Sequence, residues 1–275
     1  PSEEGLMTAG GWPRKGRRSN VMMLAVALLA VAPPHPAWAE SCVLGAQHAG
    51  VTFPVEKIDA GWGCRIKPII ENHTTANKVG PLRTAMDESM YFYLLDRPPV
   101  AAALINRLDL APYKAETRGP DQWWGNDGDG TEGIVQLVYH DHTSRVYYLE
   151  GTHHSRLLPN LSGKAVVFLR MSAIKEPNGV ESMDSTMVSY TRLDNRVLSG
   201  PVSLLRPLIG GTVTRKLAKG VDVVNRLGLE MRQYPERLLF EATDPPSLPA
   251  EDVTFLKEAL ASPQKKDSSI NQGKP

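Results

Sequence analysis

Apolar and polar residues follow two different periods along this chain and divide it into helical and strand-like stretches. From Gly80-Pro81 onward, apolar side chains recur at helical spacing as far as Leu94. Proline is preorganised for the first position of a helix, so this pattern predicts an amphipathic helix that ends before Arg97. A second short helix is predicted over Val100–Leu108, after a pair of prolines.

The segment from residue 113 to residue 191 carries short β-like runs bounded by turn residues. Its connectors Asn126–Gly130, Asp141–Ser144 and Glu176–Gly179 are short and have the composition of tight turns. Short connectors join neighbouring antiparallel strands. We therefore predict a continuous meander of six strands over 113–118, 122–125, 133–140, 145–151, 165–173 and 180–191.

Beyond Gly200-Pro201 the helical period returns, with apolar residues three or four apart from Val213 to Met231. This spacing predicts one long helix over Pro201–Gln233. Paired glycines weaken a helix by about 1 kcal/mol each relative to alanine, so we expect Gly210-Gly211 to kink or divide it and to act as a gate. Residues 242–275 are expected to form a C-terminal tail with one short helix.

The first 39 residues have the three parts of a secretory signal peptide. Basic residues at 14–18 precede the apolar run Val21–Val31, and Ala37-Trp38-Ala39 supplies a cleavage pattern. A membrane anchor would need roughly 20 apolar residues, and the run is shorter. A lipidated N-terminus is disfavoured because the acidic Glu40 lies just before the first cysteine. We predict export, to the periplasm or the medium.

The part that would remain after cleavage has nearly equal numbers of basic and acidic residues, because the signal removes four of the first and two of the second. This balance gives no electrostatic reason to expect nucleic acid as a partner. Residues 40–79 show no sustained period and are expected to be an irregular N-terminal extension. Cys42 and Cys64 are expected to pair in an oxidising compartment, which would contribute about 3 kcal/mol; two free thiols are the alternative.

This order of elements resembles the helix-grip fold of the START-like superfamily, which includes lipid-transfer domains and a class of pollen allergens. Three features carry the resemblance. They are Asp96–Val100 at the start of the second helix, the strand with Trp123-Trp124 that leads into Asp127–Gly130, and Thr191–Asp194 at the end of the last strand before the long helix. The resemblance covers about residues 80–234, and residues 80–241 are taken as the ligand-binding domain. The sequence departs from the simplest members of the family because it lacks a clear first strand ahead of the helices. Either residues 51–70 supply this strand or the sheet is smaller.

The resemblance implies an α+β fold in which a curved antiparallel sheet wraps around the long helix and leaves a cavity for apolar molecules. Apolar residues at period two support one buried sheet face, and methionines in neighbouring strands would give a deformable wall. A filled core explains the same residues equally well. The expected ligand-binding residues are Val135, Leu137, Tyr139, Tyr148, Leu169, Met171, Met187, Leu217, Val221 and Val224.

Other chemistry is weakly indicated. His140 and His142 are predicted at one end of a strand and His153-His154 at its other end, too far apart to share a metal ion. Asp127 and its neighbours fail the spacing of a calcium loop and fit a glycine-rich turn. We find no nucleophile elbow, phosphate loop or dinucleotide motif, so no catalytic residue, metal or cofactor is assigned.

We expect an exported monomer that binds or carries a lipid or another apolar small molecule, with transient membrane contact and no nucleic-acid partner. Two alternatives remain at this point. One is an enzyme of the same fold, cyclase-like or hydrolase-like, with Tyr139, Tyr148 and His140 as acid or base groups. The other is a structural module whose core is filled.

Overall fold

A computed structural model describes residues 42–154, 160–177, 179–194 and 206–261. The chain separates into two units, Pro1–Ser41 and Cys42–Pro275, and everything below concerns the second. The predicted leader therefore lies outside the described residues, as do the first residues expected of the long helix and the polar end of the tail. Among the described residues, no helix is both long enough and apolar enough to cross a bilayer.

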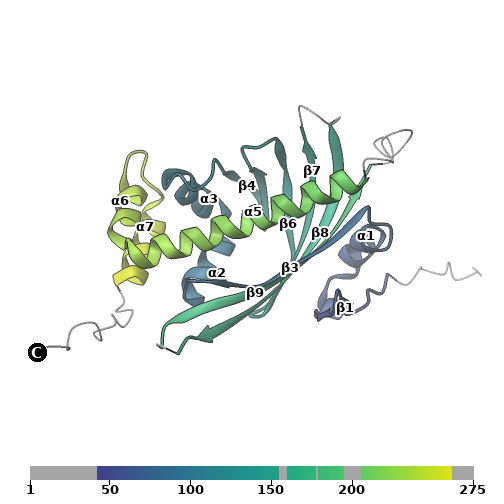
Figure 1. Cartoon of the computed structure of the whole chain (residues 1–275), viewed down its shortest axis with the longest axis horizontal. Helices are drawn as coiled ribbons and strands as arrows, with labels where there is room; N and C mark the ends of the chain where they lie inside the picture. The colour runs from purple at the N-terminus through teal and green to yellow at the C-terminus, as the bar shows by residue number, and fades with distance from the viewer. Residues whose placement is uncertain (1–41, 155–159, 178, 195–205, 262–275) are drawn as a thin grey trace, which may run out of the picture. The chain divides into compact units, whose positions relative to one another are not determined.

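Seven antiparallel strands of the described chain form one sheet in the order β3-β9-β8-β7-β6-β5-β4 (Figure 1). The six strands predicted from the sequence are all present, with ends shifted by a few residues. The seven strands are β3 Thr75–Thr84, β4 Lys114–Gly119, β5 Gln122–Asn126, β6 Thr131–His140, β7 Ser144–His153, β8 Leu161–Lys175 and β9 Glu181–Leu193.

The sequence did not predict β3, which pairs with β9 and forms one edge of the sheet. Gly80-Pro81, expected to start a helix, instead lies inside β3 where the register shifts between Val79 and Leu82. Gly80 has a φ of 115°, which a residue with a side chain rarely adopts. Proline is tolerated there because β3 is an edge strand and Pro81 falls in a bulge.

Two helices follow β3, α2 (Glu88–Asp96) and α3 (Pro98–Arg107). The start of α2 at Glu88 is fixed by Asp87, whose carboxylate accepts a hydrogen bond from the amide of Met90 at 2.9 Å. The first helix therefore begins several residues later than predicted. The second agrees closely with its prediction.

The long helix α5 spans Arg206–Gln233 without interruption, so the predicted break at Gly210-Gly211 is wrong. Two glycines cost about 2 kcal/mol of helix propensity, which the packing of a long amphipathic helix outweighs. Pro235 ends α5 as predicted and opens a further helix, α6 (Pro235–Thr243). The short helix expected in the tail is α7, Ala250–Ala261.

The N-terminal extension is more regular than predicted. It holds a small hairpin of β1 (Gln47–His48) and β2 (Val51–Thr52), a 3-10 helix over Val55–Lys57, and helix α1 over Ala60–Glu71. Helix α1 contains Pro68 and two glycines, which hide a helix from propensity reasoning. Its start is capped by Asp59, whose carboxylate accepts from the amide of Gly61 at 2.9 Å.

The sheet has two faces, and different elements cover them. We call the face that meets the hairpin and α1 the α1 face, and the face crossed by α5 the α5 face. On the α1 face, Val146, Tyr148, Val166, Phe168 and Val188 form one core with apolar residues of the extension. On the α5 face, Met171 and Met183 join a second core with α2, α3, α5, α6 and α7.

The sheet curls around α5, and two polar contacts on one turn of that helix demonstrate it. Thr214 donates a hydrogen bond to Asn77 of β3 at 2.7 Å, at one edge of the sheet. Lys216 reaches Asp127 at 2.7 Å and Asp129 at 2.8 Å, in the turn between β5 and β6 near the other edge. Both edges of the sheet therefore reach the same turn of α5. This is the helix-grip arrangement.

A row of glycines crosses the sheet. Gly125 pairs with Gly133, Gly133 with Gly151, and Gly151 with Gly163, in four consecutive strands. A Cβ atom on Gly133, Gly151 or Gly163 would lie 2.4, 2.5 or 2.6 Å from a backbone oxygen of the neighbouring strand. Only glycine allows this close approach of backbones, which a tightly curled sheet requires.

Candidate ligand-binding surface

Eight of the ten residues predicted to bind a ligand lie on the α5 face or on α5 itself. Strand pairing aligns Val135 with Leu149, Leu137 with Tyr147, and Met187 with Leu169. Because side chains alternate along a strand, each aligned set shares one face. The eight residues are Val135, Leu137, Leu169, Met171 and Met187 on the strands and Leu217, Val221 and Val224 on the helix.

Tyr139 and Tyr148 lie on the α1 face, so their predicted place in the cavity is wrong. The register of β6 against β7 shifts between Leu137 and Tyr139, and this bulge turns Tyr139 to the side opposite Leu137. The Tyr148 hydroxyl donates to Glu150 at 2.8 Å, and its ring packs against Trp62 of α1. The Tyr139 hydroxyl donates to Asp141 at 2.8 Å, and burial and this bond raise the pKa of Tyr139 to about 12.

Apolar side chains on the α5 face are buried to different extents. The C-terminal half of α5 contributes Val223, Leu227 and Met231, which are at most 4% exposed and belong to the filled core. Between residues 213 and 224, α5 also carries apolar residues that are only half-buried, and the strands carry others on the same face. These half-buried residues are Val213, Leu217, Val221 and Val224 on α5, and Val135, Leu149, Ala165, Val167, Leu169 and Met187 on the strands.

Unfilled space lies beside Gly220, in the middle of α5. Gly220 precedes the buried Leu227 by seven residues, about two helical turns, so both point to the sheet. A Cβ atom built on Gly220 would have no heavy atom within 4 Å outside its own helix backbone and chain neighbours. The described chain therefore leaves open space at Gly220, on the side of α5 that also carries half-buried apolar residues. We call these residues and this space the α5 strip.

Polar groups mark the N-terminal end of the strip. The Asp127 carboxylate also accepts from the amides of Asp129 and Thr131, so the predicted turn is correct. Partial burial opposes ionisation, but the hydrogen bond from Lys216 and those backbone amides lower the pKa of Asp127 below its ordinary value. Burial likewise disfavours the charged form of Lys216, and the two aspartates outweigh it and raise its pKa. This ion triad holds α5 against the sheet.

A second polar group lies toward α2 and was missed in the sequence. Arg145 is 3% exposed on the α5 face of β7, is paired with Asp96 at the end of α2, and lies with its guanidinium carbon 5.5 Å from the centre of the Phe92 ring. Tyr147 follows it on the same face, and burial raises the pKa of Tyr147 to about 12 against the opposing effect of Arg145.

The predicted histidines do not come together. His140 and His142 lie at the turn between β6 and β7, and His153-His154 lie at the opposite end of β7. Among the described residues, no group of three histidine, cysteine or carboxylate side chains is placed to hold a metal ion. His153 accepts or donates a hydrogen bond with Thr131 at 3.0 Å, and burial lowers its pKa.

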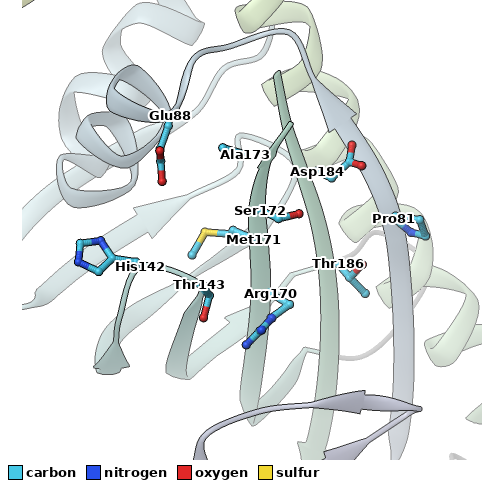
Figure 2. A pocket seen from close by; sticks show the side chains of 10 residues that line it. All are labelled: Pro81, Glu88, His142, Thr143, Arg170, Met171, Ser172, Ala173, Asp184 and Thr186. Carbon is cyan, nitrogen blue, oxygen red and sulfur yellow. The ribbon is translucent and has the colours of Figure 1, made fainter. Parts of the chain in front are cut away.

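A different hollow, of about 430 Å³, lies beside the β6–β7 turn, between the ends of β8 and β9 and the start of α2 (Figure 2). Its walls carry charges of both signs, including Glu88, Arg170 and Asp184, together with His142. Asp184 is already paired with Arg83 at 3.0 Å. This hollow is lined by charged groups and by Met171, one of the predicted ligand-binding residues, and by none of the half-buried residues of the α5 face named above.

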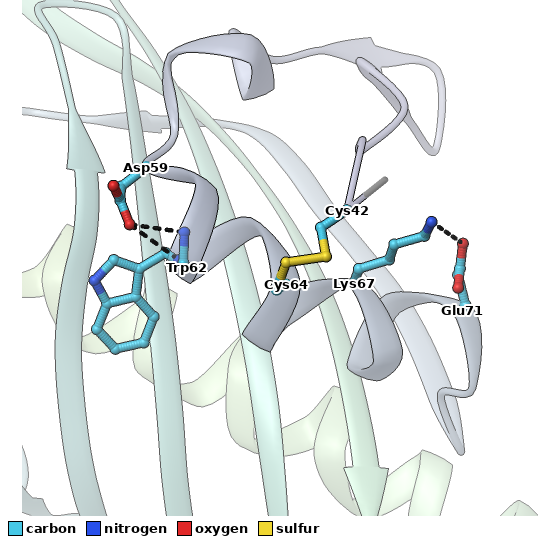
Figure 3. Close-up of a disulfide and its surroundings, with 7 residues drawn as sticks. Cys42, Asp59, Trp62, Cys64, Lys67 and Glu71 are labelled. Carbon is cyan, nitrogen blue, oxygen red and sulfur yellow. Dashed lines mark hydrogen bonds and ion pairs between the residues drawn. A yellow bond between two sulfur atoms is a disulfide. The ribbon is translucent and has the colours of Figure 1, made fainter. Parts of the chain in front are cut away.

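The two cysteines are joined by a disulfide between Cys42 and Cys64 (Figure 3). The bond connects the start of the described chain to the middle of α1. The same helix carries an ion pair between Lys67 and Glu71, 3.8 Å apart. The disulfide therefore belongs to the cover of the α1 face.

Comparisons with known proteins give distant structural likenesses. A conserved protein from Geobacillus kaustophilus is 10% identical, with a TM-score of 0.40, over 57% of this chain and 95% of that one. An uncharacterized protein from Rhizobium leguminosarum is 13% identical, with a TM-score of 0.33, over 57% and 97%. The di-domain aromatase/cyclase StfQ of steffimycin biosynthesis is 12% identical, with a TM-score of 0.34, over 63% and 56%.

No protein-family model matches the chain, and no curated protein matches it. With TM-scores below 0.5, these likenesses carry no argument about function. The fold assignment rests on strand order and on the contacts of α5.

Proposed function

We propose that this chain is a START-like carrier that binds an apolar small molecule, such as a lipid, in the α5 strip. The observation that carries the proposal is the unfilled space at Gly220 among apolar side chains that are left half-buried. Apolar surface in contact with water costs about 25 cal/mol per Å², so an apolar ligand that covers the strip gains this free energy. On the opposite face of the same strands, Val146, Val166 and Phe168 are buried against the N-terminal extension, and Val138, Tyr139 and Tyr190 are half-buried against the same core.

The alternative of a structural module is disfavoured by the same observation, because a filled core would close the space at Gly220. The enzyme alternative loses its candidate residues, since Tyr139 and Tyr148 lie on the α1 face and His140 is exposed. Export remains part of the proposal. The disulfide Cys42–Cys64 favours it, because such bonds persist in oxidising compartments.

A neutral naphthylamine dye, N-phenylnaphthylamine, tests the proposal because its fluorescence rises in apolar surroundings. We expect saturable binding to protein purified without detergent. Replacing Gly220 with Leu should fill the space and weaken dye binding at least about tenfold, since a bulky side chain then occupies the volume of the ligand.

Gly211→Leu is the matched control. Gly211 belongs to the same helix and also has open space where a Cβ atom would lie, and it is nine residues from Gly220, half a turn away at about 100° per residue. This variant should bind the dye like the parent protein. Equal dye affinity in the Gly220→Leu protein and the parent would remove the α5 strip as the binding site.

A further inference from the structure

Arg145 is a cation almost completely removed from water, in a protein whose proposed ligand is apolar. Its side chain is 3% exposed and packs on the α5 face of β7. Burial of a guanidinium is costly and is tolerated only when charged or hydrogen-bonding partners compensate for it. The Asp96 carboxylate accepts a hydrogen bond from one terminal nitrogen of Arg145, and the Tyr147 hydroxyl is a second hydrogen-bonding partner of the guanidinium.

Compensation at Arg145 is incomplete. Its Nε atom is buried and has no hydrogen-bond partner in the structure. A buried donor without an acceptor is destabilising, and such groups in native proteins call for an explanation. An acceptor oxygen brought by a ligand would satisfy Nε.

The position of Arg145 relative to the α5 strip is fixed by strand pairing. Arg145 pairs with Leu169, and Tyr147, the next residue on the same face, pairs with Leu137 and Val167. Leu169 and Val167 are half-buried residues of the strip. Arg145 and Tyr147 therefore form the end of the strip nearest α2, with Tyr147 itself half-buried.

Two hydroxyl groups reinforce the polarity of this end. Burial keeps Tyr147 and Tyr91 protonated by raising the pKa of each, and the positive charge of Arg145 opposes both shifts. A protonated phenol donates a hydrogen bond. The end of the strip thus offers a guanidinium N–H and phenolic O–H groups, all of which are donors.

We propose that Arg145 and Tyr147 bind the carboxylate of an amphipathic ligand whose apolar body lies along the α5 strip. The ligand class is a long-chain monocarboxylic acid, as in a fatty acid. The inference rests on the proposed function and adds a head group to it. Hydrogen bonds to a charged acceptor are roughly twice as strong as neutral ones, so the acid should be preferred over its uncharged derivatives. Nε is covered in the structure, so the head group must move a neighbouring side chain aside to reach it.

Competition against N-phenylnaphthylamine by lauric acid, methyl laurate and lauryl alcohol tests the head group. In the parent protein at neutral pH, lauric acid should displace the dye at a concentration about tenfold lower than the ester or the alcohol. This factor corresponds to about 1.4 kcal/mol. The three competitors have the same apolar chain, so the comparison isolates the carboxylate.

Two variants assign the preference to named residues. Arg145→Met keeps much of the side-chain volume and should reduce the preference for the acid over the ester and the alcohol, measured within this variant, to less than about threefold. Asp96 is 55% exposed, so water can solvate its carboxylate once Arg145 is gone. Tyr147→Phe removes only a hydroxyl and should reduce the preference by a smaller factor. Arg170→Met, at an exposed arginine on the α1 face, should change nothing.

The outcomes separate the two proposals. Equal displacement by acid, ester and alcohol in the parent protein would overturn the head-group inference and leave the apolar carrier intact. A preference for the acid that survives in both Arg145→Met and Tyr147→Phe would also overturn it. Absence of dye binding altogether would end the proposed function and this inference with it.

Discussion

Val166 and Val167 are neighbours in β8, and their environments differ because their side chains point to opposite faces of the sheet. Val166 is fully buried on the α1 face, among Phe53, Phe168 and residues of α1. Val167 is half-buried on the α5 face. At this point of the sheet, one face is a closed core and the other is only partly covered. Under the proposed function, residues such as Val166 stabilise the fold and residues such as Val167 contact the ligand.

We attribute this difference to the curl of the sheet around α5. A substitution in the glycine row should disturb that curl. In Gly151→Ala, the new Cβ would lie 2.5 Å from the backbone oxygen of Glu132, and β6 and β7 must separate to accommodate it. We expect a loss of about 3 kcal/mol or more in the free energy of unfolding, measured by urea denaturation.

Gly211→Ala is the control for that substitution, because its Cβ would meet nothing within 4 Å. Alanine favours a helix over glycine by about 1 kcal/mol, so this variant should gain stability. A Gly151→Ala protein as stable as the parent would mean that the glycine row is not needed for the curl.

The disulfide tests how far the cover of the α1 face depends on a covalent link (Figure 3). Its cysteines are 22 residues apart, and a link over that distance contributes about 3 kcal/mol by restricting the unfolded chain. Replacing both Cys42 and Cys64 with Ser should lower the unfolding free energy by about that amount.

Dye binding sharpens the disulfide experiment, because the α5 strip contains no residue of the extension. The Cys42→Ser, Cys64→Ser protein should therefore bind N-phenylnaphthylamine as the parent does, at a temperature where both remain folded. If its dye affinity fell together with its stability, the two faces would not be independent.

The valine pair gives the most direct measure of the comparison. Val166→Ala removes buried carbon atoms from a closed core and should cost about 2 kcal/mol. Val167→Ala makes the same chemical change at a half-buried position and should cost less than about 1 kcal/mol in the ligand-free protein. Urea unfolding of both variants gives the two values. Equal costs would show that the α5 face is as fully packed as the α1 face.

The sequence predicted the six strands of the meander well, because period-two patterns and short turns are local signals. It placed Tyr139 and Tyr148 on the wrong face of the sheet. A bulge between Leu137 and Tyr139 reversed the side of Tyr139, and no local signal marks such a shift. Strand β3 and helix α1 were missed for a related reason, since Gly80-Pro81 and Pro68 suggest helix starts and helix breaks that tertiary pairing overrides.

The residues of the candidate site were likewise predicted where the signal is local and missed where it depends on tertiary contacts. Hydrophobic periodicity found most residues of the α5 face, because burial on one side of a strand is a repeating pattern. Arg145 and Gly220 were not found, since their meaning depends on what lies opposite them in space. A lone arginine in a strand or a lone glycine in a helix carries little information until its neighbours are known.

The smallest expected effect is the contribution of His48, which is buried on the α1 face, to the pH dependence of stability. Its ring is 4% exposed, stacks on Phe168 with ring centres 4.2 Å apart, and lies with Nδ1 3.3 Å from the Tyr190 hydroxyl. Its Nε2 atom is buried without a hydrogen-bond partner. Burial lowers the pKa of His48 below its ordinary value of 6.5, so the folded protein favours the neutral ring.

The sign of the pH effect follows from that shift. Below about pH 6.5 the unfolded chain binds a proton that folded His48 resists, so stability is complete above this pH and declines as the pH falls through it. The midpoint of urea unfolding should therefore drop between pH about 7.5 and about 5. His48→Phe, which keeps an aromatic ring against Phe168, should show a smaller drop, and His142→Asn at the exposed turn should behave like the parent. A drop of the same size in His48→Phe would show that the closed face does not hold the group responsible.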